Sequence, residues 1–487
     1  MSIVHLFDNS IHIPIEAKFP CRTLEGINKN NIVDFRYLSS LTIGEIMEDN
    51  ENGLLVWPNS FQECNDELKD QYIFRLLEKE KNTVDILSTG NIVGFIGYKG
   101  TDIRIHSRFS STIWKKNEGR DYFLYYMLSK VLSINFFNLY TSSAQDEAVF
   151  DYLWFFFPKF LKEALSQGMF KKYVYNEYND ANIRGVIDVN RHIRLNIPAN
   201  GKIAYRTREF SYDNCVTQLV RHTIEFIHRK PFGTAILHND PETESCVQQV
   251  IQATPTFQLQ QRQAVINDNL RPIVHPYYTK YAALQKLCLR ILRHEKMSYD
   301  SKTNDNKIHG ILIDAAWLWE EYVACVLAER GHSLKHYTRK SNYHLFRKAN
   351  GQPFQQIIPD YYDGDKVVAD AKYIPLHRYD HLDADRASAV YYKTIMYMYR
   401  FNTQKGFLFH PCSKQDAENE REKDLINYDE LNGIVTCNYQ IEDRTDCNLY
   451  KVGIVINDAT NYSDFKQLMG KTEEAFVDII SKKTKYE

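Results

Sequence analysis

The chain has 487 residues and a formal net charge of −2, with 44% hydrophobic and 13% aromatic residues. A chain of this length is too long for a single hydrophobic core, so two to three packed domains are expected. The nearly neutral charge excludes a global basic field for nucleic acid, and any site for a polyanion must therefore be a local patch.

The cysteine pattern and the absence of long apolar runs indicate the compartment. Nine cysteines are scattered along the chain without a C-x-x-C pair, which is typical of reduced thiols in a cytosolic protein. No apolar run reaches 18 residues, and the start, MSIVHLFDNS, lacks the basic segment of a signal peptide. We therefore expect a soluble cytoplasmic protein with no membrane partner.

The first part of the chain is predicted to be rich in strands. Residues 88–109 alternate around Gly94, Gly97 and Gly100, a pattern typical of a glycine-punctuated hairpin or barrel edge. From residue 121 the pattern becomes helical. The aromatic-rich stretches 121–137 and 149–165 have helical spacing and are predicted to be core helices.

Residues 183–210 are predicted to form one long β-hairpin, with Gly201 of the sequence PANG in the left-handed position of its turn. In that register one face is apolar and packs on the body, through Ile187, Val189, Ile193, Leu195, Ile203 and Tyr205. The other face is basic, with His192, Arg194, Lys202, Arg206 and Arg208. Such a face suits a contact with a partner protein or with DNA, and an ordinary solvated strand face is the alternative.

Further elements follow in the same order. Residues 211–230 and 277–296 are predicted to be amphipathic helices, and the polar segment 297–309 is the best candidate linker. A helix over 311–330 is expected to end at Gly331. We predict a β-rich domain over 1–110, an α+β middle region over 111–296 and an α/β domain over 297–487.

The stretch IIPDYYDGDKVVADAKYIPL, residues 357–376, carries the chemistry. A turn at Asp363-Gly364 joins two short apolar strands, and a loop centred on Gly364 pairs residue numbers that sum to 728. Asp370 then lies opposite Ile358, and Asp360 is its diagonal neighbour, about 7–8 Å away at Cα. Lys372 shares their face because side chains alternate along a strand.

Two carboxylates on one face suit Mg²⁺, with Mn²⁺ as the alternative cation. Such a cation polarises a phosphoryl oxygen and lowers the pKa of a bound water, and the lysine holds or deprotonates that water. Asp360, Asp370 and Lys372 therefore predict metal-assisted phosphodiester hydrolysis. The alternative is a solvated strand face, since an isolated D-x-K is common.

Neighbouring segments add candidates. Either Glu320 or Glu321, on the helix before the hairpin, is expected to supply a third acid to the metal, the alternative being that both are exposed. Residues 331–350 contain no acid, and their cations would contact a DNA backbone or would lie on an edge strand. The cations are Lys335, Arg339, Lys340, Arg347 and Lys348, interleaved with Tyr337, Tyr343 and Phe346.

Two other motifs are weak. His377 and His381 have helical spacing, but Pro375 favours a loop, so a zinc site is not expected. Gly470-Lys471-Thr472 lacks the preceding glycine of a P-loop, because Phe465 occupies that position. We therefore expect that this chain binds no nucleotide.

These residues resemble a known family. The core Asp360, Asp370 and Lys372 is similar to that of the PD-(D/E)xK nucleases. The ordered set LWEEYV, IIPDYY, VVADAKY and DADRASAVYYKTIMYMYRF resembles the McrC nuclease subunit of McrBC-type restriction systems, in particular its LlaJI-like branch. The upstream segments GFIGYKGTDIRIHSRF, DYFLYYMLSKV and NIRGVIDVNRHIRLN also resemble that branch, so the similarity covers roughly residues 90–410.

The resemblance implies roles for single residues. Asp360, Asp370 and Glu320 match the metal ligands and Lys372 the catalytic lysine, with Trp319 where the family has Phe. On a helix after this motif, many family members have Lys or Gln followed by Tyr, and Lys393 and Tyr397 match these positions. The match adds Lys393 to the expected DNA contacts. Where many members have Asp in a preceding R-x-D, the chain has Arg386-Ala387-Ser388, which puts one auxiliary contact in doubt.

The resemblance also implies a fold and partners. The expected fold is α/β, with a C-terminal PD-(D/E)xK mixed sheet flanked by helices after an α+β adaptor region. The expected function is a Mg²⁺-dependent endonuclease subunit of a modification-dependent restriction system. It would bind double-stranded DNA and a McrB-like hexameric AAA+ GTPase, which it stimulates through its adaptor region. The alternatives are a non-catalytic adaptor of that motor and a stand-alone DNA-repair nuclease.

Overall fold

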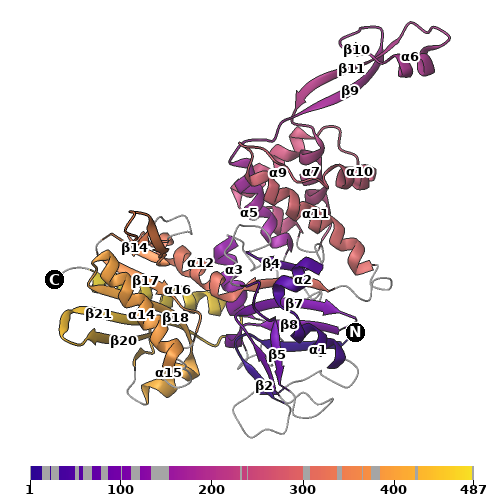
Figure 1. Ribbon diagram of the computed structural model, residues 1–487. Helices are drawn as coiled ribbons and strands as arrows, with labels where there is room; N and C mark the ends of the chain where they lie inside the picture. The colour runs from indigo at the N-terminus through magenta and orange to yellow at the C-terminus, as the bar shows by residue number, and fades with distance from the viewer. Residues whose placement is uncertain are drawn as a thin grey trace. The chain divides into compact units, whose positions relative to one another are not determined.

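A computed structural model describes the protein over residues 2–13, 22–23, 32–49, 54–58, 68–77, 86–99, 101–110, 121–132, 153–230, 233–238, 240–299, 308–336, 343–364, 366–374, 384–422 and 426–484. The chain divides into two compact units (Figure 1). Unit 1 combines Met1–Tyr140 with Asp305–Glu487, and unit 2 is Thr141–Asn304. The mixture of helices and sheets confirms the α/β class.

The first sheet of unit 1 has five strands in the order β1-β8-β7-β12-β4. The strands are β1 (Ser2–Phe7), β4 (Leu54–Trp57), β7 (Ile92–Tyr98), β8 (Thr101–His106) and β12 (His309–Asp314). Strands β7 and β8 are antiparallel, which confirms the predicted hairpin. The distant strand β12 lies between β7 and β4, so both segments of unit 1 contribute strands to this sheet.

Two glycines allow β12 to lie close to β7. Gly94 has φ +136°, and a Cβ there would stand 2.0 Å from the carbonyl oxygen of Ile311. Gly310 has φ +155°, and a Cβ there would stand 2.2 Å from the carbonyl oxygen of Phe95. No side chain fits either space. Gly94, one of the glycines of the predicted hairpin, is therefore required because the backbone of β12 lies too close for a Cβ.

A smaller sheet and two helices complete the N-terminal part of unit 1. The sheet has the order β3-β2-β6-β5, with β2 (Ile11–Ile13), β3 (Arg22–Thr23), β5 (Phe74–Leu77) and β6 (Ile86–Thr89). The helices are α1 (Ile32–Ser40) and α2 (Ile43–Asp49). Their apolar side chains share one core with the five-stranded sheet, and Phe35 and Phe74 within it are buried.

The segment after residue 308 differs from the prediction of one continuous helix. It forms strand β12 first, and helix α12 (Ala315–Glu329) begins only after Asp314, whose side chain accepts hydrogen bonds from the backbone N–H groups of Ala316 and Trp317. Such an N-cap contributes about 1 kcal/mol and sets the boundary. The end of α12 is as predicted, because Gly331 has φ +65° just beyond it.

The second large sheet of unit 1 has seven strands in the order β13-β16-β17-β18-β21-β20-β19. They are β13 (Lys335–His336), β16 (Tyr361–Asp363), β17 (Val367–Ala371), β18 (Lys405–Ser413), β19 (Asn427–Asp429), β20 (Ile434–Ile441) and β21 (Arg444–Ile456). Strands β17, β18 and β21 are parallel neighbours, and the other pairs are antiparallel. Helix α14 (Ala384–Phe401) is the crossover from β17 to β18.

Helices pack on both faces of this sheet. On one face Phe409 of β18 meets Phe476 of α16 (Tyr462–Thr484) and accepts a hydrogen bond at its carbonyl from the indole N–H of Trp319 on α12. On the other face Gly406 lies against Met398 of α14. Helix α15 (Lys414–Arg421) follows β18, and α3 (Tyr122–Leu132) joins α12 and α16. The predicted core helix at 121–137 is therefore confirmed by α3 over Tyr122–Leu132, while residues 133–137 lie outside the described residues.

A buried ionic contact joins the first sheet to the end of β17. Arg108, in the 3-10 turn η1 (Arg108–Ser110), forms an ion pair of 3.1 Å with Asp8 and donates a hydrogen bond of 3.2 Å to the carbonyl of Tyr373. The Arg108 guanidinium also lies 4.3 Å from the centre of the Tyr373 ring. The N-terminal sheet thus holds the chain immediately after Lys372.

Unit 2 consists of a helical body and an extended arm (Figure 1). The body contains α5 (Leu153–Leu165), α7 (Cys215–His228), α8 (Gly233–Leu237), α9 (Pro241–Ala253), the 3-10 turn η3 (Leu259–Gln261), α10 (Arg262–Asp268) and α11 (Lys280–Tyr299). Helices α5, α7 and α11 confirm the helices predicted in these regions. The arm contains β9 (Lys172–Asp180), β10 (Val186–Ile187), α6 (Val189–Asn196) and β11 (Ile203–Ser211).

The prediction of one long hairpin over 183–210 is wrong, although β10 pairs antiparallel with β11 over two residues and Gly201 has the predicted positive φ, +74°. Strand β11 pairs with β9 along its whole length, and the segment between β10 and β11 is helix α6. The Asp188 side chain accepts a hydrogen bond from the Arg191 backbone N–H and starts this helix. Val189 and Ile193 are four residues apart, so their spacing fits a helix as well as one face of a strand.

Of the six apolar residues predicted to pack on the body, Tyr205 is buried, whereas four are largely exposed: Ile187, Val189, Ile193 and Leu195. Val189 is 61% exposed and Ile193 51% exposed. Arg194 lies on α6, whereas Arg206 and Arg208 lie on β11, so the three cations do not form one strand face.

No helix within the described segments is both long and apolar enough to cross a lipid bilayer.

Candidate active site

The candidate site lies at the end of the β16–β17 hairpin. Tyr361 pairs with Ala369 and Asp363 with Val367, so the paired numbers sum to 730. The predicted sum of 728 is therefore wrong by one pair, because the turn is centred one residue later. The even sum preserves the face, and extending the ladder by one pair places Asp360 directly opposite Asp370 rather than diagonal to it.

Asp370 is the most buried charge of the site. Its side chain is 1% exposed, and both carboxylate oxygens lack a hydrogen bond of ordinary geometry. Two ammonium groups compensate the charge instead: Lys372 forms an ion pair with one oxygen, and Lys393 Nζ of α14 lies 3.9 Å from the other. Burial opposes ionisation, but Lys372 and then Lys393 lower the pKa of Asp370 to about 2.

Asp360 lies beside Asp370, but its pKa is shifted in the opposite direction. Its Oδ2 accepts a hydrogen bond of 2.7 Å from the backbone N–H of Ala371, which fixes the carboxylate across the hairpin. Burial and then the negative charge of Asp370 raise the pKa of Asp360 well above its ordinary value, and Glu320 adds to this effect. Two neighbouring buried acids with pKa values pushed apart are a recognised mark of a functional site.

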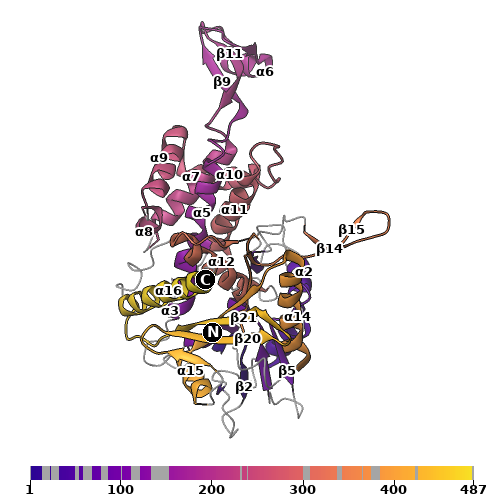
Figure 2. The ribbon, with the colours of Figure 1, turned by 90° about the vertical axis from the view of Figure 1, so that its left-hand side faces the viewer.

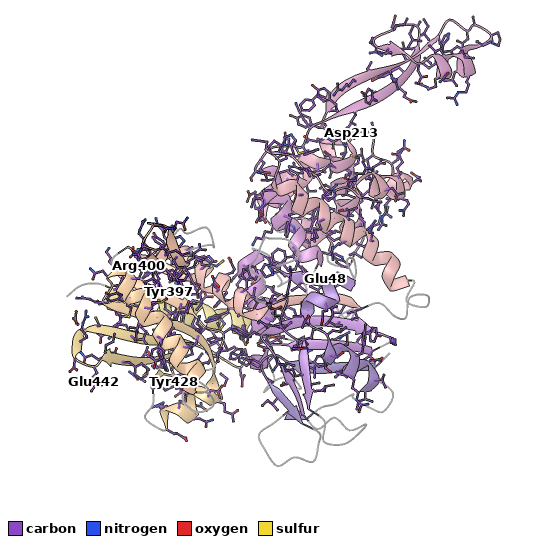
Figure 3. The ribbon with its side chains drawn as sticks, viewed as in Figure 1. Glu48, Asp213, Tyr397, Arg400, Tyr428 and Glu442 are labelled. Carbon is purple, nitrogen blue, oxygen red and sulfur yellow. The ribbon has the colours of Figure 1, made fainter. Side chains whose placement is uncertain are left out.

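The hairpin is supported on both sides. The Tyr397 hydroxyl of α14 donates a hydrogen bond of 2.8 Å to the carbonyl of Ile358, and the Tyr361 hydroxyl donates to the carbonyl of Glu320 on α12. Tyr397 and Arg400 both extend from α14 (Figure 3). The two helices therefore position the segment that carries Asp360.

Glu320 takes part in a pair that the sequence did not indicate. Its Oε1 lies 2.8 Å from Nε2 of His336, on β13. Burial opposes protonation, but the hydrogen bond to Glu320 and the charge of Glu321 raise the pKa of His336. Since Glu320 and His336 are 16 residues apart with no spacing motif, only the sheet topology brings them together.

The donor set fits a hard divalent cation. Among the described residues no three Asp, Glu, His or Cys side chains gather closely enough to hold a metal by themselves. Mg²⁺ needs only one or two carboxylates, because it keeps several waters and binds substrate phosphate oxygens. Asp360 and the buried carboxylate of Asp370, whose oxygens are compensated by the two ammonium groups, meet that requirement.

The predicted DNA-contacting residues are only partly gathered here. Lys393 adjoins Asp370, whereas Lys335 is exposed on β13 and Arg347 on β14 (His344–Arg347). Arg339 and Lys340 lie outside the described residues, as do Tyr337, His377 and His381. Gly470-Lys471-Thr472 lies within helix α16.

Comparison with known proteins identifies the family. A sequence model described as "McrBC 5-methylcytosine restriction system component" matches residues 87–411. The chain belongs to this family of restriction system components. The match includes the whole β16–β17 hairpin and helix α14, and it does not decide whether the chain belongs to the LlaJI-like branch.

Two solved structures are similar at low identity. One is a refined half-complex from the tetradecameric assembly of Thermococcus gammatolerans McrB AAA+ hexamers with bound McrC, at 12% identity and a TM-score of 0.48. That comparison covers 98% of this chain and 100% of the other. The other is the T. gammatolerans McrBC complex, at 11% identity and a TM-score of 0.31, covering 67% of this chain and 87% of the other. No curated protein matches the chain.

Proposed function

We propose that the chain is a Mg²⁺-dependent endonuclease subunit of an McrBC-type restriction system, with Mn²⁺ as an alternative cation. The observation that carries this proposal is the buried Asp370 carboxylate, which lies between Lys372 and Lys393 and beside Asp360. The order of strands and helices around β17 supports a PD-(D/E)xK assignment for residues 297–487.

The chemistry follows from the residues in place. Asp360 and Asp370 would hold the cation, with Glu320 as a further acid, and the bound cation supplies Lewis acidity and a water of lowered pKa. Lys372 orients the attacking water and stabilises the negative charge that develops on the phosphorus oxygens. Lys393 is partly exposed beside Asp370, and its ammonium group holds the DNA phosphate.

Substitution of the two central residues tests the activity. Asp370→Ala and Lys372→Ala are expected to abolish DNA cleavage, since loss of one preorganised group costs about 10²–10³-fold in rate. Both variants should keep their fold and their effect on the partner GTPase. Wild-type cleavage by either variant would disprove the assignment, and a wild-type chain that cleaves no DNA even with the motor and GTP would favour the adaptor alternative.

The proposed partner is a McrB-like hexameric AAA+ GTPase that docks on the adaptor region 111–296. Support comes from the arm of unit 2, where the exposed apolar side chains form a surface unlike that of a free monomer. They include Tyr175 (66%), Val186 (69%), Val189 (61%), Ile193 (51%), Leu195 (51%) and Ile197 (65%). Arg194, Arg206 and Arg208 of the same arm are proposed to contact this motor or DNA.

The remaining properties follow from this assignment. The motor hydrolyses GTP and this chain binds no nucleotide, so cleavage of double-stranded DNA requires both proteins. DNA cleavage by this chain alone, without motor or nucleotide, would favour a stand-alone repair nuclease. A cytoplasmic location is proposed because a restriction system meets incoming DNA there.

A further inference from the structure

A small hairpin next to the candidate site presents an exposed aromatic pair. Strands β14 and β15 (Pro353–Gln356) form a separate two-stranded sheet, and the hairpin extends outward from the seven-stranded sheet (Figure 2). Phe346 pairs directly with Phe354 across the two strands. Their rings are stacked with centroids 6.5 Å apart and an interplanar angle of 29°.

The base of this hairpin is fixed to the core. Tyr343 packs edge-on against Phe401 of α14, with centroids 5.0 Å apart, and its carbonyl accepts a hydrogen bond from the N–H of Ile357. Arg400 Nε donates a hydrogen bond of 2.8 Å to the carbonyl of His344. Helix α14 therefore anchors the base of the hairpin, and the ladder between β14 and β15 extends from this base.

The tip is apolar and basic at once. Phe346 is 56% exposed and Phe354 50% exposed, so their mutual contact leaves about half of each side chain free. Arg347 and Lys348 directly precede the turn, and Lys348 Nζ lies 5.4 Å from the centre of the Phe354 ring. Residues 331–359 contain no acidic residue, which gives the hairpin the charge of a polyanion-binding element.

The hairpin is continuous with the candidate site. Only six peptide units separate Phe354 from Asp360, so their Cα atoms lie within about 22 Å of each other. That length is comparable with the width of a DNA duplex. A duplex whose phosphate lies at Asp360 and Asp370 is thus within reach of the tip.

We propose that the β14–β15 hairpin is a minor-groove wedge that binds the DNA duplex beside the phosphate to be cleaved. Phe346 and Phe354 insert at a base step, as exposed apolar side chains do in proteins that bend DNA. Arg347 and Lys348 bind the flanking phosphates. This inference rests on the proposed nuclease function and adds the element that deforms its substrate.

The test measures DNA binding by the full chain in a buffer with a metal chelator, which prevents cleavage. The DNA duplexes carry the fluorescent base 2-aminopurine, whose emission rises when it is unstacked. The variant Phe346→Thr with Phe354→Thr removes both rings but keeps residues that favour strands. The variant Phe346→Tyr with Phe354→Tyr keeps the rings. The matched control is Leu431→Thr, because Leu431 is 94% exposed at the turn between β19 and β20, at the other edge of the sheet.

The threonine variant is expected to bind duplex DNA about tenfold more weakly and to lose the fluorescence rise, because stacking on an aromatic ring contributes strongly per base. The tyrosine variant and the Leu431 control should behave as wild type. A third variant, Arg347→Gln with Lys348→Gln, should lower the slope of log K against log salt by about 1.8.

Two results would overturn the inference: wild-type protein that raises no 2-aminopurine emission, or a threonine variant with unchanged affinity and emission. Loss of binding to the AAA+ GTPase, with DNA binding intact, would instead make the hairpin a protein interface. Failure of the nuclease proposal is distinct, since it would appear as absent cleavage in Mg²⁺ with the motor and GTP present, while the wedge still unstacks the duplex.

Discussion

At the scale of single residues, the candidate site depends on the charge of Asp370, whose burial is energetically unfavourable. A buried carboxylate without hydrogen bonds costs several kcal/mol unless cations compensate it. Asp370 keeps its charge only because Lys372 and Lys393 lie beside it, which excludes the alternative of a solvated strand face for this residue. Such an arrangement contributes little to stability, and we propose that it serves to bind a cation and a phosphate.

Lys393 provides a prediction that separates catalysis from metal binding. Replacing it by Gln removes a positive charge 3.9 Å from Asp370, so Mg²⁺ should bind more tightly, because one repulsive charge is absent. Cleavage should nevertheless fall by about 10–100-fold, since the phosphate loses an electrostatic contact. Calorimetric Mg²⁺ titration and single-turnover cleavage measure the two effects. Lys414→Gln on α15 is the control, and parallel changes in both quantities would contradict the assigned role.

His222 of α7 predicts how the stability of unit 2 depends on pH. Burial, then the charges of Arg262 and Arg221, lowers the pKa of His222 to about 4, and both ring nitrogens lack hydrogen-bond partners. The unfolded chain binds the proton near pH 6.5, so stability is lost as the pH falls from 6.5 toward 4, by up to about 3 kcal/mol.

His222→Phe should remove this loss while keeping the ring contact with Phe257. Thermal unfolding at pH 7 and pH 4.5 measures the difference. An equal drop in wild type and variant would show that other groups cause the acid sensitivity.

At the scale of elements, the sequence predicts which side chains share a face of the hairpin, but not the exact register in which its residues pair. The even sum that places Asp360, Asp370 and Lys372 on one face follows from side-chain alternation. The shift from 728 to 730 depends on the turn, whose Asp-Gly-Asp sequence allows more than one loop. Local patterns also failed where an N-cap decides the element, at Asp188 and Asp314, because apolar spacing alone fits strand and helix.

Pairs that depend on distant segments carried no sequence signal. His336 with Glu320, and Arg108 with Tyr373, meet only because separate strands come together in the fold. Lys393 was indicated by family resemblance and not by its spacing from Asp370. The carboxylates and Lys372 could be predicted because they lie on one hairpin.

The Arg108 contact predicts how the N-terminal sheet supports the site. Arg108→Met would remove the cation that pairs with the fully buried Asp8, which should cost about 3–5 kcal/mol of unfolding free energy. Cleavage should fall as well, because the Tyr373 carbonyl follows Lys372 directly. Adding Asp8→Asn to this variant should recover part of the stability, as a double-mutant cycle by urea unfolding would measure. A single variant as stable as wild type would show that the ion pair has no net effect.

At the scale of the whole molecule, the two proposed tasks belong to different compact units. The candidate site and the β14–β15 hairpin lie in unit 1, and the exposed apolar arm lies in unit 2. The units therefore offer variants that affect one task alone. The composition of the arm favours a protein partner over DNA, because its apolar residues outnumber its cations and DNA contacts need charge.

The last prediction concerns this arm. The variant Val186→Ser, Val189→Ser and Ile193→Ser replaces side chains that are 69%, 61% and 51% exposed, so the fold should be kept. Binding to the proposed partner AAA+ GTPase should fall at least tenfold, because each exposed apolar side chain buried in an interface contributes about 1 kcal/mol or more. GTPase stimulation and motor-dependent cleavage should fall with it, while Mg²⁺ binding in unit 1 stays unchanged.

A second variant, Arg194→Ala, Arg206→Ala and Arg208→Ala, separates charge from apolar contact on the same arm. Exposed ionic contacts contribute only about 0.2–1 kcal/mol each, so this variant should weaken motor binding less and mainly at low salt. Arg229→Ala with Arg271→Ala, exposed on the helical body of unit 2, is the matched control. If the serine variant binds the motor as wild type does and the arginine variant loses DNA instead, the arm is a DNA-binding element and the motor docks elsewhere.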